Sequence, residues 1–213
     1  MREATDWNNY NTNPNSKLLQ TIFFKPIANS YLKLLKRADF SNNISILEFG
    51  CGTGYITKRI VEKYPTDCVT LIDSNRRMLD IANTTLSKVN CKKELIQEDF
   101  FNFDPNKAYD LVHSQGVIEH FEQEKRLDLL KKHRDATKLN GYCILYSPTP
   151  TKSYRIFRKI LELFRSWKFI DEVPLKEEII VKEMEALGFT KIKTTYFWKY
   201  FLTEVGIIFK RVK

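Results

Sequence analysis

The stretch Ile46-Leu47-Glu48-Phe49-Gly50-Cys51-Gly52-Thr53-Gly54 decides how this chain folds. Its first half is apolar and, with Ile44, predicts a short buried strand. Glycines at alternate positions follow, and residues 55–61 then begin a helical pattern. Glycine permits a tight turn and a close approach of backbone to ligand, and a helix N-terminus offers free N–H groups. The stretch therefore predicts a ligand site at the end of a strand in an α/β fold.

The spacing of the glycines indicates which ligand is bound. A dinucleotide fingerprint, G-x-G-x-x-G, needs glycine at position 55, where this chain has Tyr55. Here Glu48 precedes glycines at 50, 52 and 54 in an E-x-G-x-G-x-G pattern. This pattern resembles motif I of the class I S-adenosylmethionine-dependent methyltransferases. The alternative is a generic Rossmann-like turn that binds no such cofactor.

An acidic residue lies one βα unit further along. The apolar run 68–72 predicts a second strand, and Asp73 stands at its end. An acidic side chain in this place can accept hydrogen bonds from ribose hydroxyls. Ser74 is the predicted N-cap of the next helix. Met78, one turn into that helix, is expected either to pack against the face of the adenine ring or to belong to the hydrophobic core.

A second landmark follows the predicted fourth strand at 110–112. Residues 114–120 read S-x-x-V-I-E-H and resemble the motif after strand 4 in the quinone-biosynthesis-type (methyltransferase type 11) group. Some relatives extend it to E-x-x-E-H and hold a divalent metal there. Because Gly116 replaces the first glutamate, only Glu119 and His120 are left, and we expect no metal. His120 is the candidate catalytic base, with a purely structural hydrogen-bonding role as the alternative.

The resemblance implies an α/β fold, a Rossmann-like, seven-stranded, mostly parallel sheet with an antiparallel terminal hairpin. Helices cover both faces, and an N-terminal helical cap precedes the sheet. We expect a single methyltransferase domain over 1–213, since the chain has no repeat, low-complexity tract or linker. Its parts are an arm and helical cap (1–43), a cofactor-binding core (44–146) and a substrate-side helix with the hairpin (147–213).

The resemblance also implies the cofactor, S-adenosyl-L-methionine, which leaves as S-adenosyl-L-homocysteine. Asp99 is then expected to hold the adenine amino group with Phe100 beside the ring, and Ser114 and Gln115 to lie beside the transferable methyl. Tyr10, in the polar N-terminal arm, is a candidate lid residue. The full set of expected cofactor residues is Tyr10, Glu48, Gly50, Cys51, Gly52, Gly54, Asp73, Ser74, Met78, Asp99, Phe100, Ser114 and Gln115.

Composition narrows the classes of function. The net charge of +9 makes nucleic acid, an anionic membrane surface or an acidic small molecule the favoured neighbours. No apolar run reaches the roughly 20 residues that span a bilayer, and the N-terminus has no apolar signal core. The four cysteines are scattered without metal-ligand spacing. These features predict a cytoplasmic protein.

The segment 151–170 combines aromatic, aliphatic and basic residues in a way that the family resemblance does not explain. Phe157, Ile160, Leu161, Phe164 and Trp167 follow helical spacing, with cationic residues between them. An aromatic face flanked by cations can lie on an anionic membrane surface or cover an apolar substrate, and the alternative is a helix packed on the domain. We therefore expect peripheral membrane contact through residues 154–170.

The expected reaction is methyl transfer to an oxygen or carbon atom of a small or lipid-like acceptor. An RNA methyltransferase and a non-catalytic cofactor-binding subunit are the alternatives. DNA is not an expected partner, because the D/N-P-P-Y/F motif of amino-group DNA methyltransferases is absent after the fourth strand.

Two further local patterns predict chain geometry. Pro26 is expected to kink or split the helical segment 16–38. Asn140-Gly141 is expected to end the helix 122–138 as a C-cap and turn.

Overall fold

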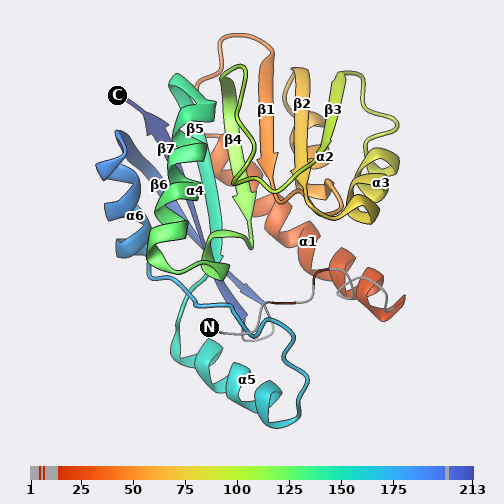
Figure 1. Cartoon of the computed structure of the whole chain (residues 1–213), viewed down its shortest axis with the longest axis vertical. Helices are drawn as coiled ribbons and strands as arrows, with labels where there is room; N and C mark the ends of the chain where they lie inside the picture. The colour runs from red at the N-terminus through yellow and green to blue at the C-terminus, as the bar shows by residue number, and fades with distance from the viewer. Residues whose placement is uncertain (1–4, 6, 8–13, 200–201) are drawn as a thin grey trace.

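The structure is a computed structural model that describes residues 5, 7, 14–199 and 202–213. Figure 1 shows a twisted sheet with helices on both faces and one helix, α5, projecting from an end of the sheet. The strands are β1 (Ile44–Phe49), β2 (Thr66–Asp73), β3 (Lys92–Gln97), β4 (Tyr109–Gln115), β5 (Thr137–Pro148), β6 (Phe189–Lys199) and β7 (Leu202–Arg211). The helices are α1 (Pro14–Leu35), α2 (Tyr55–Val61), α3 (Arg76–Thr85), η1 (a 3-10 turn, Ile118–His120), α4 (Gln123–Ala136), α5 (Lys152–Leu163) and α6 (Glu177–Ala186).

The sheet has seven strands in the order β3-β2-β1-β4-β5-β7-β6. Strands β1 to β5 pair in parallel, whereas β7 pairs antiparallel with both β5 and β6. The predicted Rossmann-like sheet with a terminal antiparallel hairpin is confirmed. Because the chain order reverses between β1 and β4, the carboxyl ends of these strands form the topological switch point at which open α/β sheets bind ligands, and this place is named the crevice.

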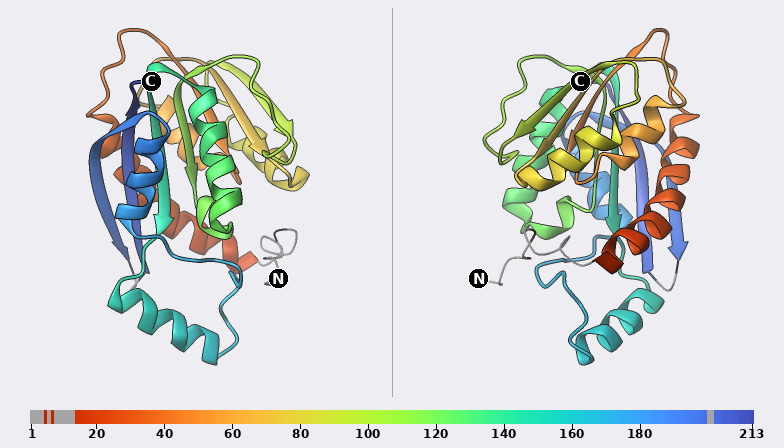
Figure 2. Two further views of the ribbon diagram at one scale, coloured as in Figure 1. Left: turned by 60° about the vertical axis from the view of Figure 1, so that its left-hand side comes forward. Right: turned by 90° about the vertical axis from the view of Figure 1, so that its right-hand side faces the viewer.

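Successive apolar side chains of the central strands point to opposite faces of the sheet, so each face of the sheet carries a hydrophobic core. In β5, Tyr142, Ile144 and Tyr146 pack with α1 and α2, whereas Cys143 and Leu145 pack with α4 and α6. Successive side chains of a strand point to opposite faces, so a strand buried on both sides is apolar throughout. The two views of Figure 2 show α1 and α4 on opposite sides of the sheet.

The prediction that Pro26 splits the first helix in two is wrong. Helix α1 continues through Pro26 as one helix of 22 residues. A proline in a helix removes one backbone hydrogen bond. The buried residues after it, including Ile27, Tyr31 and Leu35, pack against the sheet and outweigh that loss.

The prediction that Asn140-Gly141 caps a helix is also wrong. Helix α4 ends at Ala136, and β5 begins directly at Thr137. Asn140 adopts a left-handed backbone (φ 65°), and the register of β5 against β4 shifts from Tyr109↔Thr137 to Leu111↔Tyr142. The pair Asn140-Gly141 therefore forms a bulge within a strand. Local sequence preference cannot separate this role from a helix cap, because both need the left-handed backbone that Asn and Gly adopt.

A buried ion pair joins α4 to α6. Arg126 donates from Nε and Nη2 to the two carboxylate oxygens of Glu183, at 2.9 and 2.7 Å, and both side chains are 8% exposed. Two parallel bonds of this kind fix the separation and rotation of the two helices.

Glu183→Ala is expected to lower the free energy of unfolding by about 3 kcal/mol, because it leaves the Arg126 guanidinium buried without its counter-charge. Urea denaturation measures this. The double variant Arg126→Met/Glu183→Leu should recover most of the loss. An equal loss in the double variant would contradict the account.

Candidate active site

The glycine loop lies at the carboxyl end of β1. Gly50, Gly52 and Gly54 all have positive φ, at 62°, 51° and 65°. A Cβ on Gly52 would meet no atom within 4 Å, so this side of the loop is open, whereas one on Gly54 would lie 3.1 Å from Ala82. The Cys51 N–H donates to the Ile72 carbonyl at 3.0 Å and ties the loop to β2. The loop thus packs closely on α3 and leaves space at Gly52.

Asp73 fastens this loop. Its Oδ2 accepts from the Gly52 N–H at 2.8 Å, and its Oδ1 accepts from the Asn75 N–H at 2.9 Å. Burial raises the pKa of Asp73, and the two N–H donors oppose that rise. Each carboxylate oxygen accepts one of these backbone bonds and has capacity for a second donor, such as a ribose hydroxyl. The predicted ribose residue therefore lies beside the open face of the glycine loop.

The start of α3 differs from the expectation. Asn75, not Ser74, is the N-cap, and its side chain accepts from the Arg77 N–H at 3.0 Å. The two residue types are comparable caps, so sequence preference could not separate neighbours. Ser74 is exposed next to Asp73, and Met78 is buried at 4% exposure.

The predicted adenine pair follows β3. Asp99 is exposed, and its Oδ1 accepts from the Phe101 N–H at 3.0 Å, so this carboxylate also shapes its own turn. Phe100 is half-buried, with its ring centroid 6.4 Å from Phe49 and 5.8 Å from Phe121. Both residues lie at the same end of the sheet as Asp73, because Asp73 is paired with Gln97, the last residue of β3.

Glu48 lies beneath the loop. It is 3% exposed, and its Oε2 accepts from Thr57 Oγ1 at 2.6 Å, which holds the first turn of α2 against β1. Burial raises the pKa of Glu48 to about 8, helped by the charge of Asp73 and opposed by the bond from Thr57. This position suits the predicted role of orienting the loop.

Ser114 and Gln115 end β4 and point to different partners. The Ser114 hydroxyl is buried and contacts His133 Nε2 at 3.0 Å, so its side chain faces the core rather than the crevice. Its carbonyl accepts from the Tyr31 hydroxyl at 2.9 Å. The Gln115 amide instead donates to Glu204 on β7 at 3.5 Å. Gln115 thus connects the crevice to a group of acidic residues.

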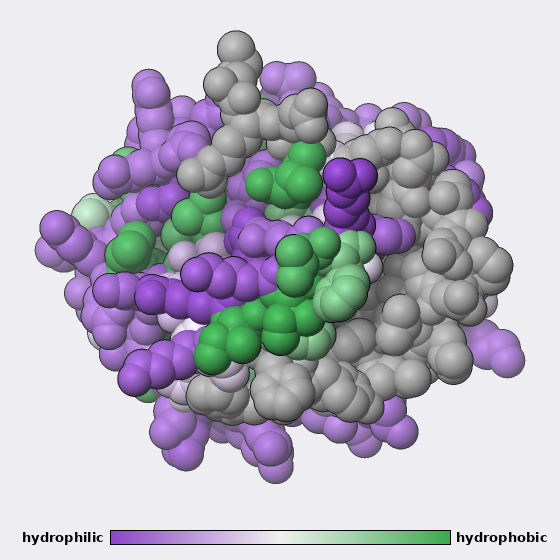
Figure 3. Space-filling view, turned by 90° about the horizontal axis from the view of Figure 1, so that it is seen from below, coloured by the Kyte–Doolittle hydropathy of each residue, from purple (hydrophilic) through white to green (hydrophobic). Residues whose placement is uncertain are grey.

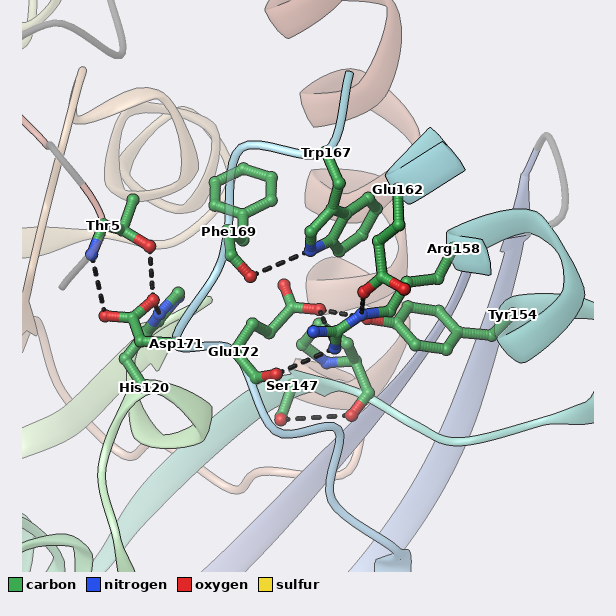
Figure 4. A network of polar contacts seen from close by, with 11 residues as sticks. Thr5, His120, Ser147, Tyr154, Arg158, Glu162, Trp167, Phe169, Asp171 and Glu172 are labelled. Carbon is green, nitrogen blue, oxygen red and sulfur yellow. Dashed lines mark hydrogen bonds and ion pairs between the residues drawn. The ribbon is translucent and has the colours of Figure 1, made fainter. Parts of the chain in front are cut away.

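His120 sits within that acidic region (Figure 4). Its Nδ1 lies 2.8 Å from Asp171 Oδ1, and Asp171 also accepts from the backbone N–H of Thr5. Burial lowers the pKa of His120, and the bond to Asp171 opposes the shift. The side chain is 6% exposed, which favours the structural alternative over a catalytic base.

Trp7 contacts residues from two sides of the crevice, His120 and Asn75. The Trp7 ring packs edge-on against His120, with centroids 4.9 Å apart. The Trp7 carbonyl accepts from the Asn75 side chain at 3.1 Å. Tyr10, the predicted lid residue, lies outside the described residues.

The sequence did not single out three acidic residues of this region, Asp171, Glu172 and Glu204. The acidic pair 171–172 follows the basic aromatic segment, which is the only local sign of it. Glu204 belongs to β7, and a strand residue gives no indication of a distant carboxylate neighbour. Their convergence arises from tertiary structure alone.

Two buried histidines lie between β4 and its helices. The His133 Nδ1–H donates to the Leu129 carbonyl at 2.9 Å, which leaves Nε2 to accept from Ser114. Burial lowers the pKa of His133 to about 4 and that of His113 to about 3, where proximity to His133 adds to the effect. Both rings are therefore neutral in the folded protein at neutral pH.

A histidine with a depressed pKa stabilises the fold above its unfolded pKa of about 6.5 and loses that contribution as pH falls. For His133 the loss extends from about pH 6.5 to about pH 4. His133→Gln should flatten the fall in unfolding free energy over this window by up to about 1.4 kcal/mol per pH unit. Urea denaturation at several pH values tests this, and an identical slope in both proteins would contradict it.

Known proteins that resemble this chain are methyltransferases, as the glycine motif predicts. Residues 46–141 match the family model of a methyltransferase domain. Among curated relatives, malonyl-[acyl-carrier protein] O-methyltransferase 2 of Ilyobacter polytropus is 30% identical over 135 residues, 62% of this chain and 48% of the relative. The corresponding enzyme of Priestia megaterium is 30% identical over 97 residues, 46% of this chain and 35% of the relative. The chain thus spans half or less of the length of these relatives.

Solved structures share the fold at low identity. Magnesium protoporphyrin IX methyltransferase from Synechocystis, with bound S-adenosyl-L-homocysteine, has a TM-score of 0.70 at 17% identity and covers 87% of this chain and 82% of that one. The N-methyltransferase NodS from Bradyrhizobium japonicum, in complex with the same product, has a TM-score of 0.68 at 14% identity, covering 99% and 94%. Residues 46–141 thus match a methyltransferase domain, as the glycine motif predicted, and both of these solved structures hold the product of S-adenosylmethionine. The chain has the fold of these class I S-adenosylmethionine-dependent methyltransferases.

Proposed function

We propose that this chain methylates a carboxyl oxygen of an acyl, lipid-like acceptor. The observation that carries the proposal is the open glycine loop fastened by Asp73, which supports a nucleoside cofactor site at the β1–β4 switch point. The acceptor class is inferred from the curated relatives, which are named for O-methylation of malonyl groups on acyl-carrier protein.

The chain's own residues would hold the cofactor in a defined way. The Gly52 side of the loop leaves room for the ligand, Asp73 can accept from ribose hydroxyls, and Asp99 can accept from the adenine amino group. Gln115, at the end of β4, would lie on the methyl side. The cofactor, when bound, supplies an activated methyl on a sulfonium, so the protein mainly positions two reactants.

A carboxyl acceptor also accounts for the state of His120. A carboxylate oxygen carries no proton at neutral pH, so its methylation needs no general base. His120 is correspondingly nearly buried and already paired with Asp171. We therefore propose that His120 supports the acceptor side and does not remove a proton.

Methyl-labelled S-adenosylmethionine, incubated with the protein and with lysate separated into lipid, carrier-protein, RNA and small-molecule fractions, tests the proposal. Label in the lipid or carrier-protein fraction is expected. Label in RNA would favour the nucleic-acid alternative instead, with steeply salt-dependent binding. Cofactor binding without label in any fraction would favour a non-catalytic subunit.

The cofactor site has its own test. Asp73→Ala should weaken binding of S-adenosylmethionine by about tenfold or more, about 1.4 kcal/mol, because it removes the ribose acceptor and releases Gly52. The matched control is Asp80→Ala, since Asp80 is an exposed carboxylate on α3 paired with Arg76. Titration calorimetry measures both. Unchanged affinity in Asp73→Ala would refute the ribose assignment.

We further propose that α5 contacts an anionic membrane surface. Ile156, Ile160, Leu163 and Phe164 are 62%, 46%, 80% and 71% exposed, and exposed cations that include Arg155 and Lys159 lie among them. Figure 3 views this end of the molecule, where hydrophobic residues gather beside hydrophilic ones. An apolar ridge flanked by cations is suited to lie in a lipid headgroup region. None of the helices in the described part of the chain is long and apolar enough to cross a bilayer.

The membrane-facing side differs in part from the sequence expectation. Helix α5 ends at Leu163, and Arg165 takes a left-handed backbone (φ 50°), so Trp167 lies beyond the helix. Trp167 turns back and packs edge-on against Tyr154, with the Arg158 guanidinium 5.3 Å from its ring centroid. The exposed ridge is therefore formed by the helix and Phe164, without Trp167.

Co-sedimentation with vesicles tests this contact. The protein is expected to bind vesicles that contain phosphatidylglycerol, to bind less at high salt, and to remain free with phosphatidylcholine alone. Leu163→Asp/Phe164→Ser should abolish the binding. The control Ile179→Ser removes an exposed apolar side chain from α6 and should have no effect. Equal binding of both variants would refute a contact through α5.

A further inference from the structure

We propose that Glu119, His120 and Glu172 form a binding site for one divalent transition-metal ion of the Mn²⁺ or Zn²⁺ class. One potential ligand atom from each residue lies within 4.8 Å of the others. A single ion bonded at the usual 2.0–2.3 Å or so to each of them would have its ligands at such separations. The residues come from η1 and from the segment that returns to the sheet after α5 (Figure 4).

The buried carboxyl group of Glu119 gives a second indication, beside the spacing of the three residues, that a cation is bound here. It is 1% exposed, and within the part of the chain that the structure describes its Oε2 has no hydrogen-bond partner. A buried carboxylate without partners is costly, and proteins normally pair it with a donor, a cation or a metal. A carboxylate oxygen of Glu119 also lies in the group with His120 and Glu172. A cation in this place would satisfy it.

His120 is oriented as metal-binding histidines are. Its Nδ1 lies 2.8 Å from the Asp171 carboxylate, which makes Nδ1 the protonated nitrogen and leaves the lone pair on Nε2. Asp171 is itself held by hydrogen bonds from the backbone and side chain of Thr5. A carboxylate that fixes the tautomer of a histidine in this way is the usual outer support of a metal site.

Glu172 completes the set from a distant part of the chain. It is 6% exposed, and its Oε1 accepts from the Tyr154 hydroxyl. The nearest cation, Arg158, has Nη1 3.9 Å from that oxygen but donates to the Glu172 carbonyl and to Glu162. The guanidinium is therefore shared between the exposed Glu162 and the backbone of Glu172, and its closest approach to the Glu172 carboxylate is 3.9 Å.

The ligand set indicates the kind of ion. Carboxylates alone suit Mg²⁺ or Ca²⁺, whereas an imidazole nitrogen favours first-row transition ions. Three protein ligands also leave positions for water or substrate, as in catalytic zinc sites. The sequence predicted no metal because Gly116 offers no carboxylate, and Glu172 is 56 residues further along the chain.

A role for the ion rests on the proposed function. Glu119 Oε1 would lie 3.6 Å from a Cβ on Gly116, so the site adjoins the end of β4 next to Gln115. Glu204, bonded to Gln115, adds another carboxylate to this region. A carboxylate acceptor would be repelled there without a counter-charge, and the ion would hold one of its oxygens.

The test uses the metal-stripped 213-residue chain, with neither cofactor nor acceptor. The chain is titrated with MnCl₂, and binding is followed by electron paramagnetic resonance and calorimetry. One ion per chain is expected. Glu119→Gln and Glu172→Gln should each weaken binding about tenfold or more. Asp128→Asn, which removes an exposed carboxylate from α4, is the matched control and should bind as the unmodified chain does.

Thermal unfolding separates loss of the site from loss of the fold. Mn²⁺ or Zn²⁺ should raise the melting temperature of the unmodified chain and of Asp128→Asn, and should leave that of Glu172→Gln unchanged. No stoichiometric binding to folded protein, or binding by both glutamine variants as tight as that of the unmodified chain, would overturn the proposal. Neither readout depends on methyl transfer, so failure of the proposed function would leave the ion site standing.

Discussion

The hydrogen bonds that the Gly52 and Asn75 N–H groups donate to the Asp73 carboxylate are the constraint on which the crevice depends. They fix a loop with positive φ at each glycine to the end of the neighbouring strand. Glu48 supports the same loop from below through Thr57. The buried carboxylates thus preorganise backbone N–H groups before any ligand arrives, which reduces the ordering cost of binding.

Charge is distributed unevenly around this loop. The chain as a whole carries +9, and exposed cations stand on α5. The region beside Gln115 instead holds the buried carboxyl groups of Glu119 and Glu172 and the half-buried one of Glu204. An acidic interior within a basic protein is consistent with two separate tasks. In the two proposals, the surface would meet an anionic partner and the interior would hold a cation that an acceptor can share.

The sequence predicted what is encoded locally. The glycine loop, Asp73 and the strand order follow from patterns within one or two βα units, and the structure has the predicted sheet. The expected break at Pro26 failed because packing of the residues after it outweighed a lost hydrogen bond. Glu172 and Asp171 could not be assigned to the site, since only tertiary structure brings residues 119 and 172 together.

The account's central claim is methyl transfer to a carboxyl oxygen. Methyl-labelled S-adenosylmethionine and an acyl acceptor with a free carboxyl group are incubated with the protein, and the isolated product is then treated with alkali. A methyl ester is hydrolysed by alkali, so the account predicts that the label is released as volatile methanol. Label that stays in the non-volatile product would place the methyl group on nitrogen, carbon or an ether oxygen and would contradict the account.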